Sequence, residues 1–259
     1  MKSLAQALSD ARAAAPSLRR RAIFLSASFP SSQRRDEFPD PADDAEIANA
    51  VVSVAKAILG ADGVLVFGGH PTITPLMLWI ARGTAAPPMS PGEPTGTRVI
   101  AYQSRVFANN TSPEMEAFQS LEGGLGRVEW VPAHDNEQAR FNEGVLDPSS
   151  VVGSLRDMRR AMLDTTRPVA AVYVGGMRGI FDEFNMATGR DPGPADTRGS
   201  AIHVIPRHYA FGAPGGAAAA LVPNAPSDAP GSLQDDLRRS RHYPDLAARI
   251  VEDIARHLP

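Results

Sequence analysis

The chain has 259 residues, of which 43% are hydrophobic and 21% are charged, and its formal net charge is −3. This length and composition suit a large buried core, and the charge provides no overall basic field that would attract nucleic acid. The absence of cysteine excludes a disulfide scaffold, a thiolate nucleophile and a cysteine-based zinc site.

Residues 1–20 place Leu4, Leu8 and Ala11 at helical spacing. They lack the apolar central region of a secretory signal peptide, and Asp10 argues against a transit peptide. No apolar run in the sequence approaches the roughly 20 residues of a membrane span. We therefore expect an N-terminal helical extension over residues 1–20 and a single domain over residues 21–259, in a cytoplasmic protein without membrane contact.

From residue 22 onward, short apolar runs alternate with helical patterns. The expected strands cover residues 22–27, 64–67, 99–102, 128–131, 170–174 and 202–205. Several of them are apolar throughout, as parallel strands covered on both faces should be. This order predicts an α/β fold, a Rossmann-like three-layer sandwich with a mostly parallel sheet of about six or seven strands.

The helices between these strands carry start and stop signals. Residues 46–59 place apolar side chains on one stripe that ends at Gly60. In the next helix, Met77, Leu78 and Trp79 are expected to be core or interface residues. Thr74 is expected to cap this helix. Later helices are expected to start at Ser112, at Ser149 or Ser150, and at Pro244.

Small or polar residues follow four of the expected strands. Ligands of open parallel sheets bind beyond the carboxyl ends of the strands, where glycine allows close approach and helix N-termini offer unpaired N–H groups. These residues are therefore predicted to bind an anionic ligand. They are Ser26 and Ser28 at the first strand, Gly68, Gly69 and His70 at the second, Gly175, Gly176, Met177, Arg178 and Gly179 at the fifth, and Arg207, Gly212, Gly215 and Gly216 after the sixth.

Several familiar motifs are absent from the sequence. It has no GxxxxGK[ST] run, so it is not a P-loop NTPase, and no GxGxxG turn follows its first strand. The lack of GxSxG argues against a serine nucleophile. The six histidines show no metal-binding spacing. We predict neither a metal site nor a separate cofactor.

The segments IFLSASFP, VLVFGGHPTITPLM and VYVGGMRGIFDEF resemble the SLOG superfamily, which joins the Smf/DprA nucleotide-binding fold with the LONELY GUY, or lysine-decarboxylase-like, proteins. The resemblance covers about residues 22–220 and is nearest to the nucleotide-sensing SLOG domains of bacterial defence systems. It implies a small nucleotide ligand derived from NAD, of the ADP-ribose or cyclic ADP-ribose type. It also implies an effector protein as partner and a homo-oligomer.

The LONELY GUY branch cleaves the N-glycosidic bond of nucleoside 5′-monophosphates and carries a PGGxGTxxE pattern. Gly175 and Gly176 match the glycines of that pattern. Val174 stands where the proline belongs, one residue is extra before Gly179, and Ile180 replaces the threonine. These departures favour a sensor over a hydrolase.

The acidic residue of that pattern falls on Asp182 when counted from the glycine pair and on Glu183 when counted from Gly179. Glu183 is therefore the catalytic residue only if the protein is a phosphoribohydrolase. In a sensor it would bond ribose hydroxyls, and without a ligand it would complement the helix dipole.

Other polar residues leave alternatives open. Arg178 could clamp a phosphate or be solvated, and His70 could contact the ligand or cap the next helix. Arg105, after the third strand, is a further candidate. The basic run over residues 238–242 is interleaved with acidic residues, which favours a solvated surface. A DNA-binding module is the weakest alternative, and it rests on the Smf/DprA resemblance.

Overall fold

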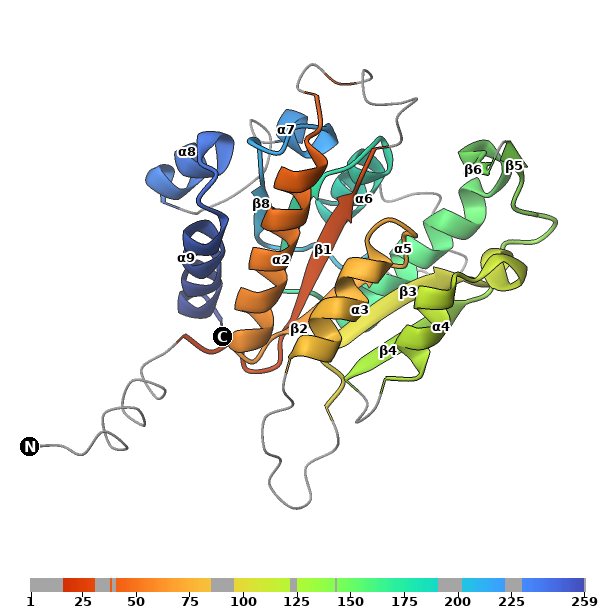
Figure 1. Ribbon diagram of the computed structural model, residues 1–259, viewed down its shortest axis with the longest axis horizontal. Coiled ribbons are helices and arrows are strands. Elements are labelled where there is room, and N and C mark those ends of the chain that lie inside the picture. Colours follow the sequence, from red (N-terminus) through yellow and green to blue (C-terminus); the bar gives the residue numbers. More distant parts are fainter. Residues whose placement is uncertain are drawn as a thin grey trace, which may run out of the picture.

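The computed structural model describes residues 16–30, 38, 41–84, 96–121, 125–142, 144–190, 202–221 and 230–258. Within these residues, six strands form one sheet in the order β4-β3-β2-β1-β7-β8, and every neighbouring pair is parallel. The expected α/β sandwich is confirmed (Figure 1). The strands are β1 (Ala22–Ser28), β2 (Val64–Gly68), β3 (Val99–Ser104), β4 (Gly126–Val131), β7 (Ala170–Gly175) and β8 (His208–Ala210).

Helices cover both faces of the sheet, and each face has its own apolar cluster. The strands alternate between the clusters: Ile23 and Leu25 of β1 belong to one and Phe24 to the other. This explains their apolar sequences. One face carries α2 (Asp44–Gly60), α3 (Thr74–Gly83), α4 (Pro113–Gln119), α8 (Gly231–Arg239) and α9 (Tyr243–Arg256), and the other carries α5 (Val152–Thr166), α6 (Gly179–Ala187) and α7 (Ala217–Leu221).

The strand order creates a switch point beside β1. The chain runs outward from β1 through β2 and β3 to β4, and then returns to β7 on the other side of β1. Ser28 pairs with Gly175 at this point. Connections that leave in opposite directions open a crevice beyond the carboxyl ends of the strands, which is where open α/β sheets bind ligands.

The predicted sixth strand is wrong. Residues 202–205 form no strand, and the sixth strand is β8, which starts at His208. The backbone of the predicted segment is bonded elsewhere, since the N–H of His203 donates to Asp164 Oδ1 at 2.8 Å and that of Ile205 donates to the Ala187 carbonyl at 2.8 Å. The chain therefore pairs with β7, as strand β8, only after Pro206.

The predicted helix starts are mostly close to the observed ones. Ser112 caps α4 by accepting from the N–H of Met115 at 3.3 Å. Thr74 is the first residue of α3 and its cap is Ile73, while α9 starts one residue before Pro244. The short hairpin of β5 (Phe141–Asn142) and β6 (Val145–Leu146), and helix α8, were not predicted.

The predicted cap of α5 is wrong. Ser149 and Ser150 lie in η4 (Pro148–Ser150), a 3-10 turn that precedes Val151 and the first residue of α5. Val151 provides no side-chain cap. The N–H groups at the start of α5 are satisfied instead by a carboxylate from the preceding loop, which is described with the site below.

Of the predicted N-terminal extension, residues 1–15 lie outside the described residues. Leu18 is fully buried in the cluster on the α2 side, and its N–H donates to the Ala61 carbonyl at 2.6 Å. The packed core thus includes a residue ahead of position 21. Among the described helices, none is long and apolar enough to cross a membrane.

Candidate ligand site

Glu183, in the middle of α6, lies at the carboxyl ends of β1 and β2. The Ser26 hydroxyl donates to its Oε2, and Gly68 lies opposite, with an ideal Cβ position 3.9 Å from Oε1. The neighbouring Asp182 points outward, with 64% of its side chain exposed, against 15% for Glu183. Of the two carboxylates that the sequence left open, Glu183 is the one at the switch-point edge.

Arg159 of α5 completes this cluster, and it was not among the predicted site residues. Its Nε lies 3.4 Å from Glu183 Oε1 and its Nη1 lies 3.3 Å from Asp182 Oδ2. The side chain is only 13% exposed. A signal was present in the sequence, because Arg159 follows Leu155 by four residues and precedes Met162 by three, which places it on the inward stripe of the helix.

The cluster has unusual electrostatics. Burial raises the pKa of Glu183 above its usual range, although Arg159 and the Ser26 hydroxyl favour the ionised form. The Glu183 carboxylate can accept a hydrogen bond from a ribose hydroxyl. It can also stabilise positive charge that develops on a sugar.

The turn between β7 and α6 offers unpaired backbone donors. Gly175 and Gly176 have φ values of 60° and 79°, which favour glycine. Within the described residues, the N–H groups of Met177, Arg178 and Gly179 donate no hydrogen bond, and α6 has no side-chain cap. These donors and the positive end of the helix dipole suit an anionic group.

Packing accounts for several of the predicted glycines. A Cβ at Gly175 would collide with Ile47, and one at Gly176 would collide with Ile180. Gly216, with φ of 73°, packs so closely that its Cβ would lie 2.9 Å from the Gly175 carbonyl carbon. The loops after β7 and β8 therefore touch through bare backbone.

Gly68 is the more open glycine of the second turn. Its Cβ would meet Met158 Cε at 3.6 Å, which is an ordinary contact, and Glu183 beyond it. A Cβ at Gly69 would collide with Met115. Gly68 thus borders the cluster around Glu183, while Gly69 is fixed by packing against α4.

Ser28 and His70 are held by local bonds. The Ser28 carbonyl accepts from the Gly176 N–H at 2.8 Å, and its side chain is buried. His70 Nδ1 lies 2.8 Å from Thr72 Oγ1, and the His70 carbonyl accepts from the Thr74 N–H at 3.0 Å. Burial lowers the pKa of His70 to about 4, so the ring is neutral at pH 7. Of the two roles left open for His70, these contacts fit the structural one.

The structure does not bring Arg207 to the predicted site. Because β8 starts later than predicted, Arg207 precedes the strand, and its Nη1 bonds Asp253 Oδ2 of α9 at 3.0 Å. Gly212 follows β8 but packs on α8, where a Cβ would lie 2.6 Å from the Arg238 carbonyl oxygen. Gly215, with φ of 72°, belongs to the turn that leads into Gly216.

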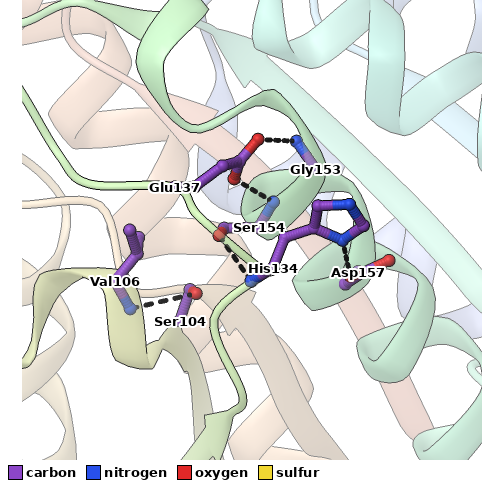
Figure 2. Close-up of polar contacts among 7 residues, drawn as sticks. All are labelled: Ser104, Val106, His134, Glu137, Gly153, Ser154 and Asp157. Atoms are coloured by element: carbon purple, nitrogen blue, oxygen red, sulfur yellow. Dashed lines mark hydrogen bonds and ion pairs between the residues drawn. The ribbon is translucent and has the colours of Figure 1, made fainter.

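A second polar cluster, also not predicted, surrounds the start of α5 (Figure 2). Glu137 Oε1 accepts from the Gly153 N–H and its Oε2 from the Ser154 N–H, both at 2.7 Å. His134 donates its N–H to Ser154 Oγ at 2.9 Å, and its Nδ1 lies 3.0 Å from Asp157 Oδ2. The segment between β4 and β5 thus supplies the cap that α5 lacks.

Hydrogen bonds in the cluster of Figure 2 shift the pKa values of two of its residues. Desolvation opposes ionisation of Glu137, but the bonds from Ser154 and Gly153 hold its pKa below the usual range. The hydrogen bond to Asp157 raises the pKa of His134. Nearby, Ser104 caps η2 (Arg105–Asn110) by accepting from the Val106 N–H at 3.4 Å. These groups position the helix that carries Arg159.

The fold and this edge define a Rossmann-like α/β domain with a cluster of polar residues at the switch point of its sheet. The family model of the SLOG cluster3 family matches residues 37–126 and 131–246, which is more than half of the chain. The chain belongs to the SLOG cluster3 family, and the predicted SLOG relationship is confirmed. Membership supports a nucleotide-related function. No curated protein and no solved structure matches the chain.

Proposed function

We propose that the protein binds a small nucleotide derived from NAD, of the ADP-ribose or cyclic ADP-ribose type, in the crevice between β1 and β7. The observation that carries this proposal is the grouping of unpaired backbone donors at the start of α6 with Ser26, Glu183 and Arg159 at one edge of the sheet. The role is that of a sensor in bacterial defence or signalling, in a cytoplasmic homo-oligomer that acts on an effector protein.

The diphosphate and the ribose of such a ligand match two neighbouring groups of residues at this edge of the sheet. The N–H groups of residues 177–179 and the guanidinium of Arg178 suit the diphosphate. Glu183 and Ser26 suit the ribose hydroxyls. Arg159 then exchanges part of its contact with Glu183 for the ligand, so that binding changes how α5 and α6 are held together.

Calorimetric titration with ADP-ribose, cyclic ADP-ribose and NAD tests the proposal. Glu183→Gln and Arg159→Ala should each weaken binding about tenfold, because a charge-assisted bond typically contributes 1.5–3 kcal/mol. Asp182→Asn is the matched control, since it alters an exposed carboxylate on the same turn. Absence of heat with all three nucleotides would refute the sensor proposal.

A phosphoribohydrolase is the second candidate, and the largely buried carboxylate of Glu183, held by Ser26 and Arg159, favours it. In that reaction water attacks the ribose C1′, the bond to the base breaks with its electron pair, and the base takes up a proton. Glu183 would stabilise the charge on the sugar. Incubation with AMP, IMP or CMP should then release free base, and Glu183→Gln should abolish the release while Asp182→Asn preserves it. Intact nucleotides after prolonged incubation would exclude this candidate.

A further inference from the structure

Helix α3 exposes a large aromatic side chain away from the crevice. Trp79 is 57% exposed, whereas Met77, Leu78 and Ile80 beside it are buried. A tryptophan that is this exposed leaves apolar surface in water, and tryptophan is enriched at the energetic centres of protein interfaces. Of the two roles predicted for Trp79, the structure excludes the core.

The indole ring is held in place by the neighbouring helix. The ammonium of Lys56, on α2, lies 5.1 Å from the ring centroid. Figure 1 shows α2 and α3 side by side on the same face of the sheet. A cation over an exposed ring contributes about 0.5–1 kcal/mol, enough to favour one orientation of the side chain. The aromatic surface is therefore presented in a defined geometry.

The charged side chains beside Trp79 on α2 and α3 are both positive. Arg82 follows Trp79 by one helical turn, on the same side of α3. Within the described residues, neither Lys56 nor Arg82 forms an ion pair. The sequence has no Asp or Glu over residues 47–61 or 63–84, and Asp62 between them pairs with Arg98. This contrasts with the net charge of −3 for the whole chain.

Two glycines leave room beside these side chains. Gly60 follows Lys56 by four residues and Gly83 follows Trp79 by four, and a Cβ at either glycine would meet nothing within 4 Å. Packing within the described residues therefore does not require glycine at these positions. Bare backbone there allows another chain to approach closely.

We propose that the surface formed by Lys56, Trp79, Arg82, Gly60 and Gly83, the Trp79 face, docks an acidic, apolar segment of a partner protein. An apolar side chain of the partner covers the indole ring, and its carboxylates pair with Lys56 and Arg82. A second copy of this chain fits less well, because a self-complementary interface would bring the same cations together. The proposal does not depend on the nucleotide proposal.

The position of the Trp79 face suits an output surface. α3 starts at Thr74, directly after the turn that contains Gly68, and Ile47 of α2 packs against Gly175. Both helices that form the face therefore begin at the edge of the candidate ligand site. A partner bound on α2 and α3 would contact elements whose ends lie at that edge.

Selection of displayed random peptides on the full chain tests the docking surface. The enriched peptides should be rich in Asp and Glu and carry aromatic or aliphatic residues. In 15N spectra of the protein with a synthetic copy of an enriched peptide, the indole N–H signal of Trp79 should shift while that of Trp130 stays in place. Trp79→Ala and Lys56→Glu should each weaken binding about tenfold or more, as hot-spot substitutions do.

Matched variants separate docking from damage to the fold. Lys56→Arg keeps the charge and should preserve most of the affinity, and Val152→Ala removes another exposed apolar side chain and should leave it unchanged. An unaltered Trp130 signal in each variant shows that the fold is intact. The proposal is overturned if no acidic sequence is enriched or if the enriched peptides bind Trp79→Ala equally well. It is also overturned if single-stranded DNA shifts the Trp79 signal in their place, or if the face proves to hold a second copy of the chain.

Discussion

Tyr173 of β7 and His208 of β8 stack on the face of the sheet that α6 covers, with their ring planes 11° apart and the Tyr173 hydroxyl 3.0 Å from His208 Nδ1. His208 Nε2 lies 2.8 Å from the Ile205 carbonyl oxygen. Nε2 therefore carries the proton, and Nδ1 accepts from the tyrosine. The ring is neutral at pH 7, because burial lowers the pKa of His208 to about 4.

Because His208 is buried as a neutral ring, the free energy of unfolding should fall in mild acid. Burial lowers the pKa of His208 to about 4, below the value of 6.5 in an unfolded chain. The unfolded chain therefore takes up a proton first, and stability is lost as the pH falls from 6.5 towards 4. The loss should be about 3 kcal/mol from this residue, at 1.36 kcal/mol per pKa unit.

Urea unfolding at a series of pH values measures this loss. His208→Asn should lower stability at pH 7 but flatten its dependence on pH between 6.5 and 4. His242→Asn, at an exposed position, should leave the slope unchanged. An equally steep slope in His208→Asn would show that other groups cause the acid sensitivity.

Substitution of Asp253 should cause a large loss of stability, because its carboxylate is a buried partner of Tyr209 and Arg207. Its buried Oδ2 accepts from the Tyr209 hydroxyl at 2.6 Å and from Arg207 at 3.0 Å. Asp253→Ala would leave the buried guanidinium of Arg207 without its counter-charge, at a cost of about 3–5 kcal/mol in unfolding free energy. The exposed neighbour Glu252 provides the control, and Glu252→Ala should change stability by less than about 0.5 kcal/mol.

A double substitution tests whether Asp253 acts through Arg207. If it does, Arg207→Ala combined with Asp253→Ala should cost less than the sum of the two single changes. Strict additivity would contradict the coupling. Neither change should alter nucleotide binding, because this pair lies away from the crevice.

The strands that are buried on both faces of the sheet are predictable from the sequence, because they are apolar throughout. β8 was misplaced because that strand has only three residues and the apolar segment before it bonds to α5 and α6. Arg159 was missed because its role depends on how α5 crosses the sheet. The turns at Gly68 and Gly175 were found because glycines at strand ends are visible in the sequence.

The carboxylate of Glu137 should stabilise α5, because it accepts from two N–H groups at the start of that helix (Figure 2). Glu137→Ala should lower the unfolding free energy by about 1 kcal/mol, as loss of an N-cap does. Because the pKa of Glu137 is depressed, its contribution persists above the unfolded value and disappears as the pH falls through the folded value. Asp135→Ala, on the same loop, is the control, and an equal loss in both variants would contradict a specific capping role.

Gly68 and Gly176, both at the candidate ligand site, differ in the room that they leave for a side chain. Gly68→Ala adds a methyl group that meets only ordinary contacts next to Glu183, so the melting temperature should stay nearly constant. Gly176→Ala should be destabilising by roughly 1–3 kcal/mol, because its φ is 79° and its Cβ would collide with Ile180. Because Gly68 borders Glu183, where the ribose is proposed to bind, the nucleotide should bind Gly68→Ala more weakly. Gly60→Ala, on the Trp79 face, should keep the affinity of the unaltered protein. Unchanged affinity in Gly68→Ala would move the ligand away from this part of the edge, towards the turn at Gly176.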